Sequence, residues 1–87
     1  MWNVSLQKPA LKSVARAPKP ERERLFAAIE EMREDPKRGN VRALHNEQAA
    51  FRRRLGDWRI FFDLYPERYL VVVVAIERRT TTTYRKR

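Results

Sequence analysis

The chain begins with a strand-like alternation of apolar and polar residues, continues through two helical stretches and ends in strand-like runs. Trp2, Val4 and Leu6 are separated by polar residues, so one face of residues 2–6 is apolar. Alternation with a period of two predicts a short, half-buried strand.

Two amphipathic helices are predicted after this strand. Pro9 suits the first turn of one helix, which should end before Pro18. Pro20 suits the first turn of another helix, which should end at Asp35-Pro36. At helical spacing, the apolar residues are Leu11, Val14 and Ala15 in the first helix and Leu25, Phe26, Ile29 and Met32 in the second. Both helices therefore require an apolar surface to pack against.

Residues 37–48 are predicted to form a connector without a helix or strand of its own. Gly39 and Asn40 are common turn residues. Val41 and Leu44 are the expected anchors of this connector in the core.

The remainder of the chain predicts three strands. Residues 50–55 and 58–64 are separated by Gly56-Asp57, which is a strong signal for a tight hairpin. Residues 69–76 include four consecutive valines and suit a strand that is covered on both faces. A strand, two helices and three more strands favour an α+β domain in which two N-terminal helices pack on one face of a mainly antiparallel four-stranded sheet.

Composition removes several classes of protein. The 87 residues form a single domain, 1–87, and include no cysteine, which excludes a disulfide framework, thiolate catalysis and cysteine-based metal sites. The one histidine, His45, cannot make a zinc site alone, so no metal or other cofactor is expected. Residues 70–76 are the longest apolar run and are too few to cross a bilayer, and residues 1–4 do not resemble a signal peptide. We expect a soluble, cytoplasmic domain with no membrane partner.

The charge of the chain is strongly positive and uneven. Twenty lysines and arginines oppose 11 aspartates and glutamates, which gives a net charge of +9 at pH 7. In residues 49–87, ten basic side chains oppose four acidic ones, and nine of the ten are arginines. Arginine is suited to bidentate contact with phosphate and to stacking on bases. The composition favours a nucleic-acid or acidic-protein partner over a charge that serves only solubility.

A two-residue loop at Gly56-Asp57 determines which side chains of the hairpin share a face. Counting outward from the loop makes Arg54 the partner of Arg59. Alternation then places on one face Arg52, Arg54, Arg59 and Phe61. The opposite face, which the helices should cover, holds Phe51, Leu55, Trp58, Ile60 and Phe62. Arg53 also falls on the covered face, where we expect its stem to be buried and its role to be structural.

Two opposed arginines destabilise a sheet by a few tenths to about 1 kcal/mol, so stability alone does not explain the pair. One interpretation is a solvated face whose charge is neutralised by Asp63, Glu67 or Glu77. The interpretation we prefer is an anion site, in which phosphate binds the arginines and a base stacks on Phe61.

Several motifs follow one another in a characteristic order. They are Leu11-Lys12 in the first helix, an Arg-Glu-Arg opening of the second, Glu34-Asp35-Pro36 at its end, and Val41-x-x-Leu44 in the connector. The most specific is the hairpin Phe51-Arg52-Arg53-Arg54-Leu55-Gly56-Asp57-Trp58-Arg59-Ile60-Phe61, and a valine-rich strand ending in Arg78 and a later Tyr84 follow it. Over nearly the whole chain this order resembles the RelE/ParE superfamily of small toxins from bacterial toxin–antitoxin pairs, whose hairpin reads aromatic-Arg-x-Arg-x-Gly-Asp-aromatic-Arg.

The resemblance implies two helices on a twisted antiparallel sheet, and a cognate antitoxin that is acidic where it binds. In the RelE-like branch, which we favour, the toxin cuts mRNA in the ribosomal A site, because the ribose 2′-hydroxyl attacks the adjacent phosphate without a metal. In the ParE-like branch the same scaffold poisons DNA gyrase. A non-catalytic, basic nucleic-acid-binding module is the third alternative. Operator DNA is expected as a partner only of the toxin–antitoxin complex.

The RelE-like pattern assigns a role to each matching residue of this chain. Arg52 and Arg54 match two basic residues that orient the RNA and assist proton removal from the 2′-hydroxyl. Arg59 and Arg78 match the arginines that stabilise charge on the phosphate, and Tyr84 matches a tyrosine that stacks on the base and helps proton transfer. The further contacts expected with RNA are Phe61, Arg79, Arg85 and Lys86.

Two departures from the family pattern affect the chemistry. Arginine stands where family members offer lysine, and it stays protonated, so it is a poor general base. It still stabilises charge on a phosphoryl group during displacement. The position before Arg78, often histidine in relatives, is Glu77, which either hinders anion binding or holds Arg78 in place. His45 lies in the connector and is not expected to act as an acid or base.

Overall fold

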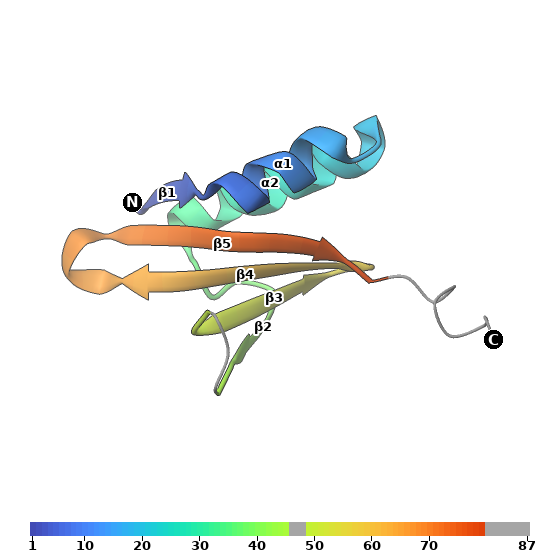
Figure 1. Ribbon diagram of the computed structural model, residues 1–87. Helices are drawn as coiled ribbons and strands as arrows, with labels where there is room; N and C mark the ends of the chain where they lie inside the picture. The colour runs from blue at the N-terminus through green and yellow to red at the C-terminus, as the bar shows by residue number, and fades with distance from the viewer. Residues whose placement is uncertain (46–48, 80–87) are drawn as a thin grey trace.

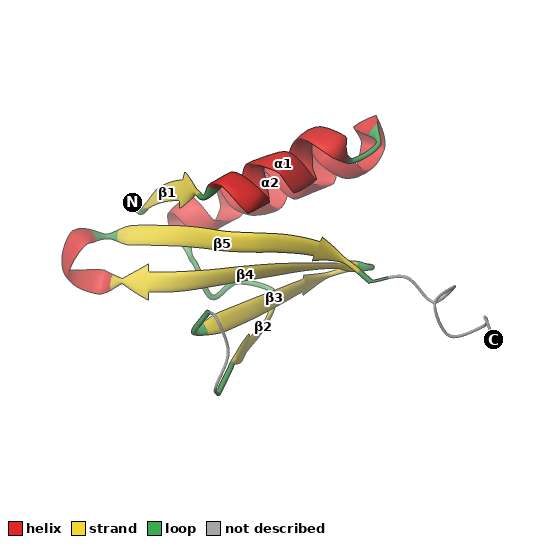
Figure 2. Ribbon diagram, viewed as in Figure 1, coloured by secondary structure: helices red, strands yellow, loops and turns green. Residues whose placement is uncertain are grey.

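The computed structural model describes residues 1–45 and 49–79. Within these residues two helices form one layer and a five-stranded sheet forms the other (Figure 1). The elements are β1 (Asn3–Leu6), α1 (Lys8–Arg16), α2 (Lys19–Glu34), β2 (Asn40–Ala43), β3 (Phe51–Leu55), β4 (Trp58–Tyr65), the 3-10 turn η1 (Pro66–Arg68) and β5 (Leu70–Arg78). Figure 2 shows both helices on the same face of the sheet, as predicted. The α+β class is confirmed.

The sheet differs from the prediction in two respects. Its strand order is β1-β5-β4-β3-β2, so the described residues form five strands where four were expected. The additional strand is β2, in the segment predicted to be a connector. Three neighbouring pairs are antiparallel, as expected, whereas β1 runs parallel to β5. The chain leaves β1 through the helix layer and reaches β5 only after β2, β3 and β4, so no tight hairpin joins β1 to β5 and the two strands can pair in parallel.

β2 forms because β3 offers it an edge. Its four residues pair with β3 from Asn40 opposite Arg54 to Ala43 opposite Phe51. Val41 packs against the core, as predicted. Leu44 does not; it lines a pocket on the other face of the sheet. A four-residue strand is too short to show a clear alternation in the sequence, so β2 can be recognised only from its pairing with β3.

The helices bury stripes that differ in part from those predicted. α1 buries Ala10 and Val14, whereas Leu11 is 55% exposed. α1 packs on β5, and a small alanine suits such a contact. α2 buries Leu25, Ala28, Ile29 and Met32, whereas Phe26 is 51% exposed. The predicted places of Leu11 and Phe26 in the core are therefore wrong, because each lies one position from the centre of the stripe that the sheet contacts. Ala15, also predicted, is exposed.

The hairpin of β3 and β4 has the predicted register. Arg54 opposes Arg59, and Phe51 opposes Phe62 with their rings stacked at 5.5 Å between centroids. Trp58, Ile60 and Phe62 are buried in the core beneath the helices. One face of the hairpin is thus fully used for packing, and the other is left for side chains that the core does not require.

β5 contains an irregularity that reverses the direction of its side chains. Phe61 opposes Ala75 and Phe62 opposes Val73, so Val74 is an extra residue in β5, a β-bulge. Before the bulge, Val71 and Val73 face the core; after it, Ile76 does. Val72 is only half-buried, so the prediction that both faces of this strand are covered holds for the helix face alone. No helix in the described residues is long and apolar enough to cross a membrane.

Candidate nucleic-acid interface

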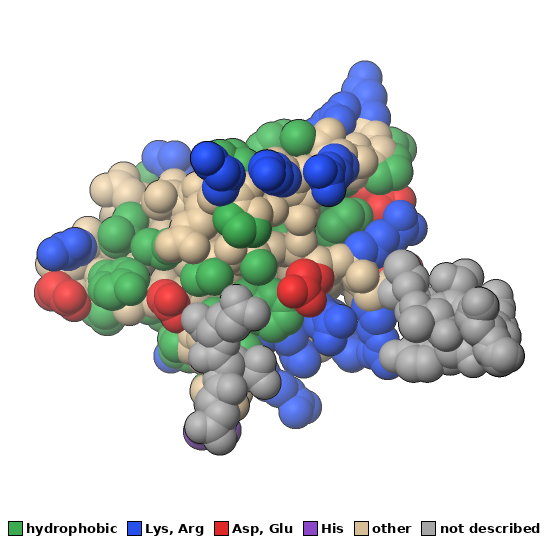
Figure 3. Space-filling model, in the orientation of Figure 1, with side chains coloured by type: hydrophobic (Ala, Val, Ile, Leu, Met, Phe, Trp, Pro, Cys, Tyr) green, Lys and Arg blue, Asp and Glu red, His purple; other side chains and the backbone are tan. Residues whose placement is uncertain are grey.

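Basic side chains gather on the face of the sheet that the helices leave open. In Figure 3 a group of Lys and Arg side chains lies on the side of the strands away from the helix layer. The register puts these side chains in two rows that cross the sheet. One row holds Arg42, Arg52, Phe61 and Ala75, and the next holds Asn40, Arg54, Arg59 and Glu77. We call Arg42, Arg52, Arg54 and Arg59 the arginine face. The predicted grouping of the last three with Phe61 is confirmed.

A pocket of about 310 Å³ opens between the two rows. It is lined by Leu44, Arg52, Arg59, Phe61, Val74, Ala75 and Glu77. The Nε atoms of Arg52 and Arg59, like that of Arg53 on the helix side of the sheet, are buried and have no hydrogen-bond partner among the described residues. A buried donor without an acceptor destabilises the fold by about 1–3 kcal/mol. The pocket is therefore suited to a ligand that supplies acceptor oxygens, such as a phosphate, beside an apolar surface.

The positive charges of this face act on one another. Burial lowers the pKa of the Arg52 guanidinium, and the charges of Arg54, Arg42 and Arg59 lower it further. Arginine nevertheless keeps its proton at any physiological pH. The mutual repulsion is relieved when an anion binds, which favours polyanionic ligands over neutral ones.

Acidic residues near this face leave most of its charge uncompensated. Asp63 accepts a hydrogen bond of 2.7 Å from the backbone N–H of Ala50, and Glu67 lies in η1 at the far end of the β4–β5 hairpin. Glu77 directly opposes Arg59 in the register. None of the ion pairs formed within residues 1–45 and 49–79 includes a member of the arginine face. The interpretation of a fully neutralised, solvated face is therefore not supported.

Arg78 lies on the opposite side of the sheet from the arginine face. Its guanidinium lies over the Trp58 ring, 5.7 Å from the centroid, and 3.6 Å from a carboxylate oxygen of Glu21. The Trp58 indole N–H donates to the same carboxylate group at 3.1 Å. The sequence-based grouping of Arg78 with Arg59 is wrong, because the bulge at Val74 turns Glu77, and not Arg78, toward the open face.

Arg79 lies beside the arginine face instead. Its backbone N–H donates to the carbonyl oxygen of Asp57 at 2.6 Å, which ties the end of β5 to the β3–β4 loop. Together with Arg54 and Arg59 it lines a second open pocket of about 280 Å³. The expected RNA contact of Arg79 stays a prediction, and its position beside Arg54 and Arg59 is compatible with it.

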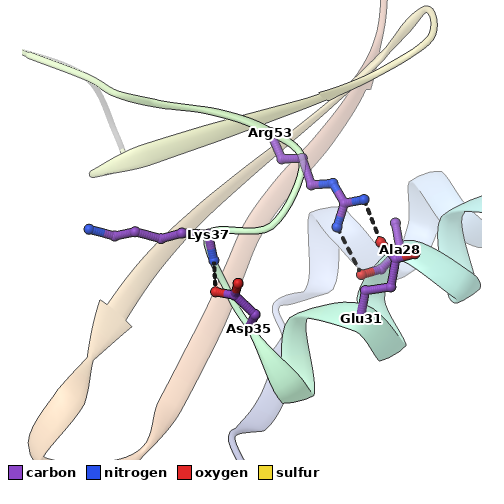
Figure 4. Close-up of polar contacts among 5 residues, drawn as sticks. All are labelled: Ala28, Glu31, Asp35, Lys37 and Arg53. Carbon is purple, nitrogen blue, oxygen red and sulfur yellow. Dashed lines mark hydrogen bonds and ion pairs between the residues drawn. The ribbon is translucent and has the colours of Figure 1, made fainter.

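Arg53 has the structural position that alternation predicted for it. It is 6% exposed and reaches back to α2, where it donates to the carbonyl oxygen of Ala28 at 3.3 Å and to a Glu31 oxygen at 2.6 Å (Figure 4). This hydrogen bond and the charge of Arg53 lower the pKa of Glu31. Figure 4 also shows the backbone N–H of Lys37 bonded to Asp35 at the end of α2. The two hydrogen bonds of Arg53 link β3 to α2.

Three of the predicted site residues cannot be placed on the interface. Tyr84, Arg85 and Lys86 lie outside the described residues. His45 is exposed and does not line the pocket. In residues 1–45 and 49–79, no cluster of three or more His, Cys, Asp or Glu side chains could hold a metal ion.

Sequence analysis missed one member of the arginine face. Arg42 belongs to β2, which was predicted as a connector, and it directly opposes Arg52. The Val41-Arg42 pair, one apolar and one basic side chain, is the only local sign that this segment continues the alternation of the hairpin. Two residues do not distinguish a strand from a loop.

No protein-family model matches this sequence, and no characterised protein matches it at the level of sequence. Solved structures do match its fold. The toxin–antitoxin complex RelBE2 from Mycobacterium tuberculosis contains a chain that superposes with a TM-score of 0.78 at 20% identity, covering 90% of this chain and 98% of that one. An archaeal RelE–RelB complex from Pyrococcus horikoshii matches with a TM-score of 0.78 at 19% identity, covering 92% and 97%.

A third similar structure is that of the isolated E. coli RelE toxin, with a TM-score of 0.76 at 18% identity, covering 97% of this chain and 92% of the toxin. Each match extends over nearly the full length of both chains, so the likeness involves the whole arrangement of helices and strands. The resemblance read from the motifs is confirmed at the level of the fold: this chain has the fold of the RelE toxins.

Proposed function

We propose that this protein is the toxin of a type II toxin–antitoxin pair and a metal-independent endoribonuclease that cuts mRNA in the ribosomal A site. The observation that carries the proposal is the pocket of the arginine face, where Arg52 and Arg59 hold unpaired buried Nε groups next to the ring of Phe61. The RelE fold supports it independently. A phosphate on the arginines and a base on Phe61 would place one nucleotide across the pocket.

In this proposal the arginines act through charge and position. Arg52 and Arg54 orient the RNA backbone, and Arg59 stabilises the negative charge that grows on the phosphate during displacement. Removing one such donor from a preorganised site typically slows a reaction by about 100- to 1,000-fold. We assign a further phosphate contact to Arg79 rather than Arg78, because Arg79 lines the pocket beside Arg54. The tail residues Tyr84, Arg85 and Lys86 complete the proposed RNA contacts.

The proposed partners are an antitoxin, the ribosome and its mRNA. Four of the structural relatives are complexes of a RelE toxin with its antitoxin, which supports a cognate antitoxin here. With a net charge of +9, this chain favours an acidic toxin-binding segment in that partner. Formation of the complex should then weaken as the salt concentration rises.

The test is toeprinting of a defined mRNA on translating ribosomes, with wild type, Arg59→Ala and the control Arg16→Ala. Arg16 is an exposed arginine at the end of α1, on the helix side of the sheet. We expect cuts at A-site codons with wild type and Arg16→Ala, and at least about a 100-fold slower reaction with Arg59→Ala. Replacing the scissile ribose by 2′-deoxyribose should abolish cutting by all three.

The other outcomes separate the alternatives. If wild type leaves the mRNA uncut but arrests growth with gyrase-dependent DNA breaks, the protein acts as a ParE-like gyrase poison. If it neither cuts nor arrests growth, it is a basic nucleic-acid-binding module. Circular dichroism spectra of the variants show whether a lost activity is due to a lost fold.

A further inference from the structure

Among the described residues that line the pocket of the arginine face, one has a side chain that can accept a proton. The apolar residues of the pocket have no acid–base chemistry, and the guanidinium groups of Arg52 and Arg59 stay protonated. The remaining member is Glu77, an exposed carboxylate. An endoribonuclease that uses the ribose 2′-hydroxyl needs a proton acceptor beside it, and the arginines cannot serve.

Glu77 reaches this position through the backbone of β5. The extra residue at Val74 shifts the side-chain alternation, so Glu77 points to the open face and Arg78 to the helix side. Glu77 directly opposes Arg59, and opposed residues of antiparallel strands have Cβ atoms about 4.5–5.5 Å apart. A phosphate held by Arg59 therefore lies next to the Glu77 carboxylate.

We propose that Glu77 is the general base of the RNA cleavage reaction, an inference that rests on the function proposed above. As the O2′–P bond forms, the 2′-hydroxyl proton passes to a Glu77 oxygen, and the P–O5′ bond breaks. The leaving 5′-oxygen takes a proton from water. The products are a 2′,3′-cyclic phosphate and a 5′-hydroxyl, and Glu77 returns its proton to solvent. No oxidant, metal or further reactant is required.

The surrounding charges suit this role. Arg52 from β3 and Arg59 from β4 face the carboxylate across the pocket, with Arg54 in the same row and Arg79 at the end of β5. The same arginines compensate the negative charge that Glu77 adds next to the phosphate, so the acid does not exclude the substrate.

The test compares single-turnover cleavage of ribosome-bound mRNA by wild type, Glu77→Gln and the control Glu67→Gln. Glu67 is also exposed but lies in η1, at the other end of the β4–β5 hairpin, so this control removes the same charge away from the pocket. Glutamine keeps a hydrogen-bond acceptor for Arg59 but cannot take the proton. We expect Glu77→Gln to cut about 100- to 10,000-fold more slowly, the usual contribution of a general base, and Glu67→Gln to match wild type.

Two further measurements separate a base from a residue that only positions Arg59. Affinity for an uncleavable RNA with 2′-deoxyribose at the scissile position should be equal or higher in Glu77→Gln, because a negative charge is removed. The cleavage rate of wild type should level off above the acidic range, whereas that of Glu77→Gln should keep rising with hydroxide concentration.

The inference is overturned if Glu77→Gln cuts within about tenfold of wild type, keeps the wild-type pH profile, or loses activity in proportion to RNA affinity. In each of these cases wild type still cuts, so the proposed function survives. If wild type and Glu67→Gln both fail to cut, the proposed function is refuted, and the role of Glu77 with it.

Discussion

The packing of Arg53 against the turn after α2 allows a quantitative prediction for Gly39→Ala. Gly39 has a φ of +86°, and a Cβ atom there would lie 2.9 Å from Nε of Arg53. Left-handed backbone destabilises an L-residue by about 1–2 kcal/mol. Arg53 is buried, so moving its guanidinium disrupts its hydrogen bonds to Ala28 and Glu31. Hydrogen bonds of charged groups contribute about 1.5–3 kcal/mol. After about 0.4–1 kcal/mol is regained from the stiffer unfolded chain, the net loss is about 2–4 kcal/mol.

Gly56→Ala is the matched control for this prediction. Gly56 also has a positive φ, +59°, and a Cβ atom there would also lie 2.9 Å from an arginine atom, Nη2 of Arg24. Arg24 is exposed, so its flexible end can swing into solvent. Gly56→Ala should therefore lower the free energy of unfolding only through the left-handed backbone, by a net amount of about 0–1.5 kcal/mol.

Thermal unfolding followed by circular dichroism measures the difference. For a domain of this size, 1 kcal/mol corresponds to about 4–8 °C in Tm, so Gly39→Ala should melt at least about 4 °C below Gly56→Ala. In an Arg53→Met background, the loss caused by Gly39→Ala should fall to that of Gly56→Ala. Equal melting temperatures of the two single variants, or an excess loss that persists without the arginine, would refute the reasoning.

Three further predictions concern the sheet and its charges. Arg42→Ala should weaken RNA binding alike for all sequences and reduce the slope of log affinity against log salt by about 0.7; an unchanged slope in a salt titration would place this residue off the RNA path. Arg78→Ala should lower Tm and leave cleavage intact, whereas Arg79→Ala should lower RNA affinity and leave Tm intact; the reverse pattern would contradict their placement on opposite sides. The pKa of Glu31 is lowered in the fold by Arg53, so its contribution to stability is complete above the unfolded value of about 4.3 and is lost as the pH falls through the folded value. The Tm difference between wild type and Glu31→Gln should accordingly shrink in acid, and a difference that grows there would be inconsistent with the pair.

Local patterns were sufficient wherever neighbouring residues in the chain determine the structure. The two-residue loop at Gly56-Asp57 set the register of β3 and β4, and with it the shared face of Arg52, Arg54 and Arg59. The same count placed Arg53 among the apolar side chains, where it is buried. Prolines near the starts of both helices marked their first turns. Each of these features depends on contacts within a few residues, so a sequence pattern carries the necessary information.

Contacts between distant segments determined the rest. β2 exists because β3 offers it an edge, which is why Arg42 was missed, and β1 pairs with β5 in parallel from the other end of the chain. Leu11 and Phe26 have the right hydrophobicity for the core, but the direction from which the sheet meets the helices leaves them exposed.

β5 separates most clearly what the sequence predicted from what the tertiary structure decided. The valine run by itself predicted a strand, and this strand lies between β1 and β4. The bulge at Val74 depends on the pairing of β5 with β4. Two residues of β5 lie opposite one residue of β4 there, and the sequence of β5 alone does not show this. That single inserted residue reverses every later side chain of the strand, and so decides that Glu77 faces the arginines while Arg78 packs on Trp58.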